Sequence, residues 1–301
     1  MGKFFDHATA QCTLKAAWGR IPRTAPTPRP KKRVRRLPTS TRPLNIRRIQ
    51  AKLRRGEFQF DPQQGVLKQK AGGNGKRGIV MASVQNRIVE RALLDSLQAK
   101  SPFIQQVLEV PTSVGGVPHR SVPHGLRVIE EAFKEASSGS PAPILLASLT
   151  VSRATPFSRR SPSTSMMRRF LIFSLAPRPS FSLERALGDD RRCFPTDKDG
   201  VAQGSPLSPL FGNILLHDFD RRLNGPGIVT PRFIDDFAIF GHSESAVAKA
   251  FATARACLDE LGLKCHDPFA DGDRTKSAHE NASIGFDFLG YRIEPGLFQP
   301  S

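Results

Sequence analysis

Long apolar runs and paired cysteines are absent from this 301-residue sequence. No apolar stretch reaches the length of a membrane-spanning helix, and the N-terminus lacks the apolar core of a signal peptide. The cysteines show no C-x-x-C pairing and no zinc-binding spacing with the seven histidines. These absences predict a reduced, cytoplasmic protein without a structural metal.

Acidic residues are missing from two long intervals. No Asp or Glu lies between Asp6 and Glu57, where fifteen Lys and Arg occur, and none lies in the 48 positions between Glu135 and Glu184. The net charge is +18, but residues 200–301 hold 9 Lys/Arg and 13 Asp/Glu, so the preceding 199 residues carry +22. We therefore expect a polyanionic partner, and we predict a basic, partly disordered arm over residues 1–43.

A pair of adjacent carboxylates, Asp235 and Asp236, lies between two short apolar runs in residues 232–240. This pattern predicts a β-hairpin with the two aspartates at its turn. Asp is common in turns, so one interpretation is that the pair only makes the turn. The other is a divalent metal site, because adjacent carboxylates repel each other unless a cation lies between them.

A Gly/Pro/Ser-rich loop followed by a helix start precedes this hairpin. Ser208 is suited to the N-cap of that helix and Pro209 to its first helical position. Residues 200–216 read G-x-x-Q-G-x-x-x-S-P-x-x-x-N-x-x-L and are followed by F-x-D-D. The combined pattern resembles the reverse transcriptase family, particularly the prokaryotic branch with group II intron and retron enzymes. The sequence leaves open which mobile element, intron, retron or antiviral defence system the chain derives from.

The resemblance implies an α+β right-hand polymerase with fingers and a palm, the palm being an antiparallel sheet backed by helices. Residues 44–135 correspond to the fingers-like region and residues 189–301 to the palm-like region, with motifs up to residue 296. The segment 136–188 is anomalous and is expected to be disordered. The chain stops ten residues past Tyr291, so we expect the thumb to be absent. Helices are expected over residues 8–18, 44–58, 86–94 and 124–135.

The family's activity is RNA-directed DNA polymerase, a nucleotidyl transfer with an RNA template, a DNA primer and dNTP, which uses two Mg²⁺ ions. The resemblance assigns Asp235 as the principal catalytic metal ligand and Asp236 as the accessory one. Phe233 is expected to pack beneath the primer end. Leu289 and Gly290 resemble the hairpin that grips the primer strand, although a plain core strand end is the alternative.

Nucleotide contacts are expected from a second, basic hairpin. Its strands are predicted at residues 67–70 and 79–81 around a glycine-rich turn, which does not fit a Walker loop. A basic hairpin alone indicates only a solvated surface, but Lys and Arg suit phosphoryl oxygens. The resemblance implies nucleotide or template binding by six residues: Lys70, Lys76, Arg77, Gln203, Gly204 and Lys276. Lys276, as a lone lysine, has a plain surface position as its alternative.

A third aspartate, which the family carries on a strand after the helix of residues 124–135, has no counterpart here. Its expected place is near residues 144–150, where no carboxylate occurs. The following Ser/Arg/Pro-rich stretch is either an RNA-binding insert or a region translated out of frame within residues 147–187. We favour the second, because shifted reading enriches Ser and Arg, which have six codons each. Another reading frame of the gene should then encode an Asp followed by Phe-Phe.

Without that carboxylate, the positive charge of two ions in one site is not fully neutralised. The transition state should lose about several kcal/mol of stabilisation, which lowers the rate roughly thousands-fold. We therefore predict little or no polymerase activity for this chain. The alternatives are a catalytically inactive nucleic-acid-binding protein and a decayed gene product without a stable fold.

Overall fold

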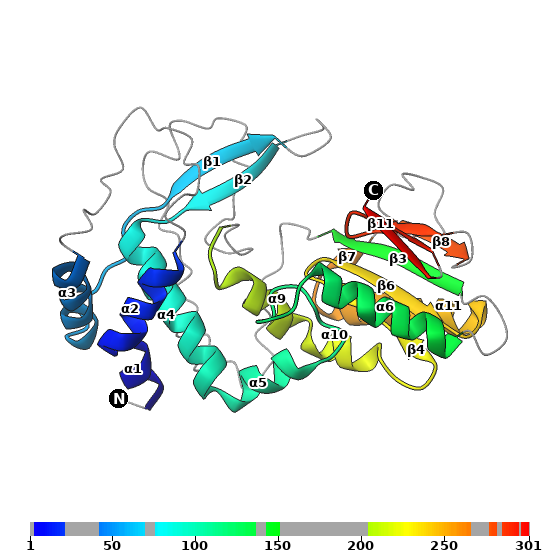
Figure 1. Ribbon diagram of the computed structural model, residues 1–301, viewed down its shortest axis with the longest axis horizontal. Coiled ribbons are helices and arrows are strands. Elements are labelled where there is room, and N and C mark those ends of the chain that lie inside the picture. Colours follow the sequence, from blue (N-terminus) through cyan, green and yellow to red (C-terminus); the bar gives the residue numbers. More distant parts are fainter. Residues whose placement is uncertain are drawn as a thin grey trace. The chain divides into compact units, whose positions relative to one another are not determined.

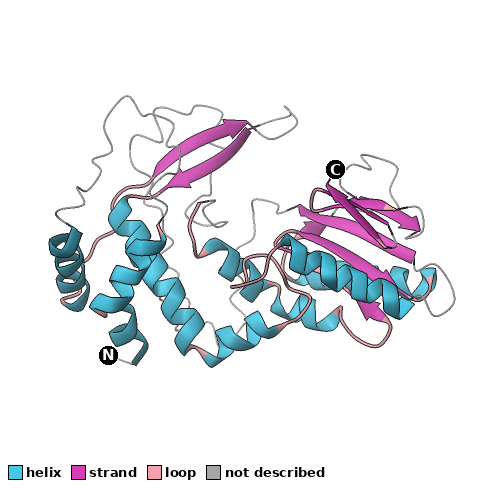
Figure 2. Cartoon of the chain, viewed as in Figure 1, coloured by secondary structure: helices cyan, strands magenta, loops and turns pink. Residues whose placement is uncertain are grey.

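The computed structural model describes residues 3–21, 42–69, 76–136, 143–150, 204–265, 277–281, 285–294 and 296–300. Helices and antiparallel strands are both present (Figures 1 and 2), which confirms the α+β fold class. The chain forms two compact units. The first contains described residues up to Gln105 and residues 204–208, and the second contains residues 106–150 and those from Pro209 onward.

The first unit packs four helices against one another and carries a two-stranded sheet. Its elements are α1 (Lys3–Ala8), α2 (Gln11–Arg20), α3 (Arg42–Arg54), β1 (Gln64–Gln69), β2 (Lys76–Met81) and α4 (Val84–Lys100). Leu14, Ile46 and Ile88 are buried together where α2, α3 and α4 meet. The Ser83 hydroxyl accepts a hydrogen bond from the Asn86 amide and so caps α4. The expected helix over residues 8–18 begins later, at Gln11, after the separate helix α1.

Strands β1 and β2 confirm the predicted basic hairpin. They pair antiparallel with Lys68 opposite Arg77 and Gln69 opposite Lys76. The turn between them lies outside the described residues, and so does Lys70. The helix expected over residues 86–94 is the middle of α4, and α3 ends at Arg54, four residues before the predicted end.

The second unit is a sheet with helices on both faces. Its helices are α5 (Pro102–Glu109, shared with the first unit), α6 (Val122–Ala136), α9 (Ser208–Leu215), α10 (His217–Arg222) and α11 (Glu244–Glu260). The large sheet contains β3 (Pro143–Thr150), β4 (Ile228–Val229), β5 (Arg232–Phe233), β6 (Asp236–Gly241), β7 (Lys264–Cys265) and β8 (Ser277–Asn281). A smaller antiparallel sheet contains β9 (Phe286–Phe288), β10 (Tyr291–Glu294) and β11 (Leu297–Pro300).

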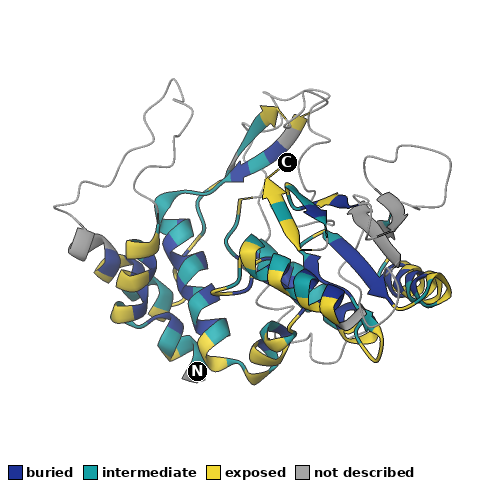
Figure 3. Ribbon diagram, turned by 45° about the vertical axis from the view of Figure 1, so that its right-hand side comes forward, coloured by how far each residue is buried: buried dark blue, intermediate teal, exposed yellow. Residues whose placement is uncertain are grey.

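Strand β6 lies inside the large sheet and is buried on both faces (Figure 3). Phe237 and Ile239 point into a core with α10 and α11, where Phe237 packs edge-on against Phe219. Ala238 and Phe240 point into the opposite core with α6 and the small sheet. Because successive strand residues face opposite sides, this all-apolar run is what a doubly covered strand requires. It fixes the carboxylate hairpin at the start of β6 to a rigid support.

Candidate active-site hairpin

The predicted carboxylate hairpin is formed by β5 and β6. Phe233 pairs with Asp236, so the two-residue turn consists of Ile234 and Asp235. The sequence prediction was therefore wrong by one position: it placed Asp235 and Asp236 in the turn, whereas Asp236 begins β6. The physical reason is that Ile234 takes a φ of 60°, the value that the first position of a tight hairpin turn demands. Propensity alone argues against this, because a β-branched residue rarely adopts positive φ.

The two aspartates differ in their surroundings. Asp235, at the turn, is exposed, and Asp236, on the strand, is half-buried. Phe233, predicted to lie beneath a primer end, is also half-buried on β5. The structure thus brings Phe233, Asp235 and Asp236 together on one hairpin, as the sequence predicted.

Strand β3 runs beside this hairpin, where the third carboxylate was expected. The backbone register sets Ser148 opposite Asp236 and Ala147 opposite Phe237. The predicted neighbour of the hairpin is therefore in place. Its sequence, Pro-Ile-Leu-Leu-Ala-Ser-Leu-Thr, contains no Asp or Glu.

A buried arginine lies at the foot of the hairpin. The Arg232 side chain is fully buried and donates two hydrogen bonds to the Asp220 carboxylate, from Nε and Nη2, both at 2.6 Å. Nη2 also donates to Ser113 Oγ at 2.9 Å and to Asn213 Oδ1 at 3.1 Å. Nη1 donates to the carbonyl oxygen of Ile234, in the turn, at 2.8 Å. Sequence reasoning missed this residue, because an arginine before an apolar strand normally indicates a solvated side chain.

The loop of residues 112–116 packs against β5 and the hairpin turn. The Arg232 amide donates to the Thr112 carbonyl at 2.8 Å, and the Val114 amide donates to the Arg232 carbonyl at 2.8 Å. A Cβ on Gly115 would lie 2.5 Å from the Ile234 nitrogen. Only glycine therefore allows this approach of loop to turn. The Asn213 side chain fixes the loop by donating to the Gly115 carbonyl at 3.0 Å.

The glycine-rich loop before α9 is described from Gly204 onward, in the first unit. Gly204 has a φ of 119°, and a Cβ there would lie 2.5 Å from the Val80 carbonyl oxygen on β2. The next residue, Ser205, donates a hydrogen bond to Glu90 Oε2 at 3.1 Å. Burial raises the pKa of the Glu90 carboxyl to about 7, although the Ser205 hydroxyl and the Arg87 charge act in the opposite direction. Gly204 thus packs closely against the backbone of β2, its role in binding nucleotide or template stays a prediction, and Gln203 lies outside the described residues.

The other residues predicted to contact nucleotide or primer stay predictions. Lys76 is exposed at the start of β2, and Arg77 follows it on the same strand. Leu289 and Gly290 form the tight turn between β9 and β10, with φ values of 54° and 78°, as a two-residue hairpin turn requires. Lys276 lies outside the described residues.

The hairpin carboxylates are the candidate ligands of a hard cation. Asp235 and Asp236 offer the oxygen ligands that Mg²⁺ prefers. Within the described ranges, however, no group of three or more His, Cys, Asp or Glu side chains is placed to hold a metal ion. In the part of the chain that the structure describes, the candidate donor set is therefore the two hairpin carboxylates alone.

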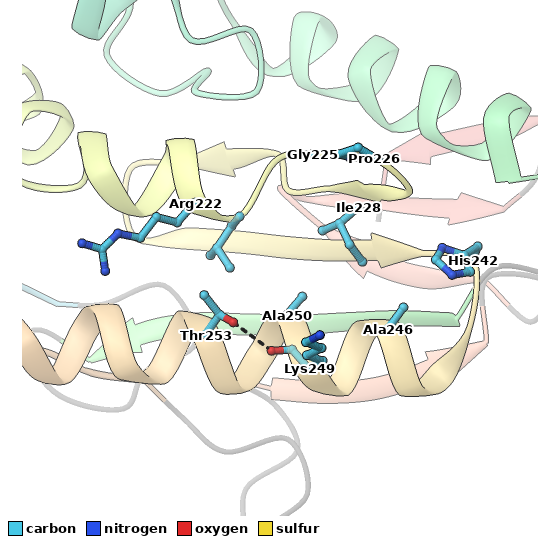
Figure 4. Close-up of a pocket in the computed structure, with 10 residues that line it drawn as sticks. Arg222, Gly225, Pro226, Ile228, His242, Ala246, Lys249, Ala250 and Thr253 are labelled. Carbon is cyan, nitrogen blue, oxygen red and sulfur yellow. Dashed lines mark hydrogen bonds between the residues drawn. The ribbon is translucent and has the colours of Figure 1, made fainter.

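A shallow pocket of about 340 Å³ lies elsewhere in the second unit (Figure 4). It is lined by the end of α10, the turn before β4 and one side of α11. His242 and Lys249 are exposed on its rim, and neither hairpin aspartate contributes to its lining. It is therefore separate from the candidate site. None of the helices in the described ranges is both long enough and apolar enough to cross a membrane.

Part of the chain is similar to a known protein family. Residues 157–293 match the family model described as reverse transcriptase (RNA-dependent DNA polymerase), which confirms the resemblance seen in the sequence. Protein YkfC of Escherichia coli (strain K12) is 25% identical over 284 residues, which cover 83% of this chain and 71% of that protein.

Among solved structures, the matches include two kinds of assembly. Apo telomerase from Candida tropicalis, truncated from its C-terminal domain, matches with 13% identity and a TM-score of 0.43, over 80% of this chain and 55% of that one. A partial Cas6-RT-Cas1–Cas2 complex matches with 20% identity and a TM-score of 0.36, over 85% of this chain and 42% of that one. The chain thus spans about half of the length of these solved proteins.

Proposed function

We propose that this protein, whose residues 157–293 carry a reverse transcriptase domain, binds RNA template, DNA primer and a divalent cation but has little or no polymerase activity. By family it is an RNA-directed DNA polymerase. The observation that carries the proposal is the register of β3 against β6, in which Ser148 stands opposite Asp236. The strand that should complete the carboxylate set is adjacent to the hairpin and lacks the carboxylate.

The proposed roles are those that the family resemblance assigns. Asp235 is the principal ligand of a Mg²⁺ ion and Asp236 the accessory ligand, and Phe233 lies beneath the primer end. The ion, when bound, would polarise phosphoryl oxygens. Leu289 and Gly290 form the turn that contacts the primer strand. Template and nucleotide contacts are assigned to the remaining predicted residues: Lys70, Lys76, Arg77, Gln203, Gly204 and Lys276.

The proposed organisation keeps a basic arm over residues 1–43, a fingers-like region over 44–135, the anomalous segment 136–188 and a palm-like region over 189–301. The +22 charge of the first 199 residues supports binding to a nucleic-acid backbone. The cysteine pattern supports a cytoplasmic location. A non-catalytic nucleic-acid-binding protein is the second candidate, and the missing carboxylate on β3 is the observation that favours it.

A primer-extension assay tests the activity directly. Wild-type protein, given an RNA template, a DNA primer, dNTP and Mg²⁺, should extend the primer no faster than its Asp235→Asn variant. A salt titration of binding to the same RNA–DNA hybrid should show binding that weakens steeply as salt rises. Robust extension by the wild type, abolished in Asp235→Asn, would show that the site is complete without a carboxylate on β3.

A thermal melt followed by circular dichroism separates these functions from the decayed gene product. A cooperative transition is expected, because β6 and its two cores form a continuous packed interior. A featureless melt of a largely unfolded chain would favour decay. Translation of the two other gene frames across codons 147–187 tests the origin of the anomalous segment.

A further inference from the structure

We propose that Arg232 is a positioning residue, which holds the hairpin turn so that Asp235 and Asp236 point to a common cation. This inference rests on the proposed function, which assigns the two aspartates as cation ligands. It adds a residue that touches neither the cation nor the substrate and acts through the backbone of the turn.

The first step is the burial of the charge. Arg232 and Asp220 have side chains that are 0% and 2% exposed, and they form a forked pair with two 2.6 Å hydrogen bonds. Removing two charges from water is costly, and well-packed apolar residues often serve stability equally well. Stability alone therefore does not explain an ion pair at this place.

The second step is the hydrogen bond of the remaining guanidinium nitrogen, Nη1. Nη1 donates to the Ile234 carbonyl oxygen at 2.8 Å. That carbonyl belongs to the peptide that joins Ile234 to Asp235, so its direction fixes the backbone from which the Asp235 side chain projects. Arg232 is thus linked to the carboxylate turn by one peptide unit.

The third step is that the turn needs this support. Ile234 has a φ of 60°, a region that β-branched residues rarely occupy and that surrounding structure must enforce. The enforcing contacts come from two sides: the Arg232 guanidinium bonds the Ile234 carbonyl, and Gly115 lies against the Ile234 nitrogen. Ser113 and Asn213, both bonded to Nη2, hold the guanidinium plane in the orientation that reaches the turn.

The fork of arginine is essential to this arrangement. The planar guanidinium presents its donors in fixed directions, so it can bond Asp220 and the Ile234 carbonyl together. A lysine ammonium keeps the charge beside Asp220 but is a single point, which cannot hold both groups in this geometry. Arg232→Lys should therefore separate the positioning role from the charge.

The experiment measures Mn²⁺ binding to full-length protein by electron paramagnetic resonance, with a thermal melt of each variant. The variants are Arg232→Lys, the double variant Arg232→Met/Asp220→Leu and Asp235→Asn. The matched control is Arg222→Gln, which removes an exposed arginine from the same helix as Asp220. The double variant removes both buried charges, so a purely structural pair can be replaced without loss of binding.

We expect Arg232→Lys and the double variant to bind Mn²⁺ about tenfold more weakly or worse, as do other changes to groups that orient metal ligands. The double variant should melt close to the wild type, and Arg222→Gln should bind as the wild type does. Wild-type affinity in a folded double variant would overturn the proposal. If the double variant fails to fold, the Mn²⁺ affinity and the thermal melt of Arg232→Lys decide instead: wild-type affinity in folded Arg232→Lys protein would overturn the proposal.

A failure of the proposed function is recognised separately. If the wild type binds no Mn²⁺, or if Asp235→Asn leaves binding unchanged, the hairpin is not the cation site. The positioning role of Arg232 is then tested by hydrogen exchange of the peptide that covers residues 232–236. Faster exchange there in Arg232→Lys, with the rest of the chain unchanged, supports the positioning role, and unchanged exchange overturns it.

Discussion

In both units an ionisable side chain is buried beside a segment predicted to bind nucleotide or metal, but the partners that compensate its burial differ. In the second unit, Arg232 is buried with a carboxylate partner, two further acceptors and a turn carbonyl. In the first unit, Glu90 is buried with the Ser205 hydroxyl as its hydrogen-bond donor, and its pKa is raised to about 7.

The two buried groups differ in how fully hydrogen-bond partners compensate the cost of burying their charge. The Arg232 guanidinium has a carboxylate partner and three further acceptors for its N–H groups, so its buried charge is compensated. Glu90, by contrast, gains or loses its proton near pH 7, so its burial favours the folded state at low pH and opposes it at high pH. The first cluster is a fixed support, and the second is a group whose contribution depends on pH.

Replacing the carboxylate of Asp220 or of Glu90 by its amide should therefore change the free energy of unfolding in opposite directions. The larger change is expected for Asp220→Asn, which leaves the buried guanidinium of Arg232 without a compensating charge. The free energy of unfolding should fall by about 3 to 5 kcal/mol, the order expected when one partner of a buried ion pair is removed. Urea denaturation at several pH values from 6 to 8 measures this, and a loss that vanished across that range would contradict the comparison.

The second effect is expected for Glu90→Gln, and it should be stabilising at high pH. Glu90 has a pKa of about 7 in the folded protein, whereas the ordinary pKa of a Glu carboxyl is about 4.5. Its contribution to stability is fully present below pH 4.5 and is lost as the pH rises through 7, by up to about 3 kcal/mol. Glu90→Gln, which cannot ionise, should thus be more stable than the wild type at pH 8 and equal to it near pH 4.5.

Denaturation of wild type and Glu90→Gln over the same pH series measures this effect. Ser205→Ala is the control, because it removes the hydroxyl that donates to Glu90 and should cost about 1 kcal/mol, mostly at high pH where the carboxylate is charged. Parallel pH curves for wild type and Glu90→Gln would show that Glu90 does not titrate near neutrality, and the contrast with Arg232 would then be lost.

Much of the fold was predictable because its signals are local. Apolar periodicity located α3 and α6, and a glycine-rich turn between two short runs located the β1–β2 hairpin. Ser208 and Pro209 placed the start of α9. The carboxylate hairpin followed from two apolar runs around two aspartates. These features need only neighbouring residues to specify them.

The parts that were not predictable depend on contacts distant in sequence. The turn position was wrong by one residue because Ile234 is held at positive φ by Gly115 and Arg232, which local propensity does not reveal. The Arg232 cluster joins Ser113, Asn213 and Asp220, none of which has a sequence pattern that marks it as a buried partner. The place of β3 beside β6 could be expected from the family resemblance, but the register that sets Ser148 against Asp236 required the structure.

The most direct test is the Mn²⁺ affinity of Ser148→Asp compared with that of the wild type. If the hairpin is a cation site that lacks a carboxylate from β3, the added carboxylate should tighten binding about tenfold or more, since affinity for hard cations rises with the number of charged ligands. The gain should disappear when Asp235→Asn is added. An unchanged affinity in folded Ser148→Asp protein, or a gain that survives Asp235→Asn, would contradict the account.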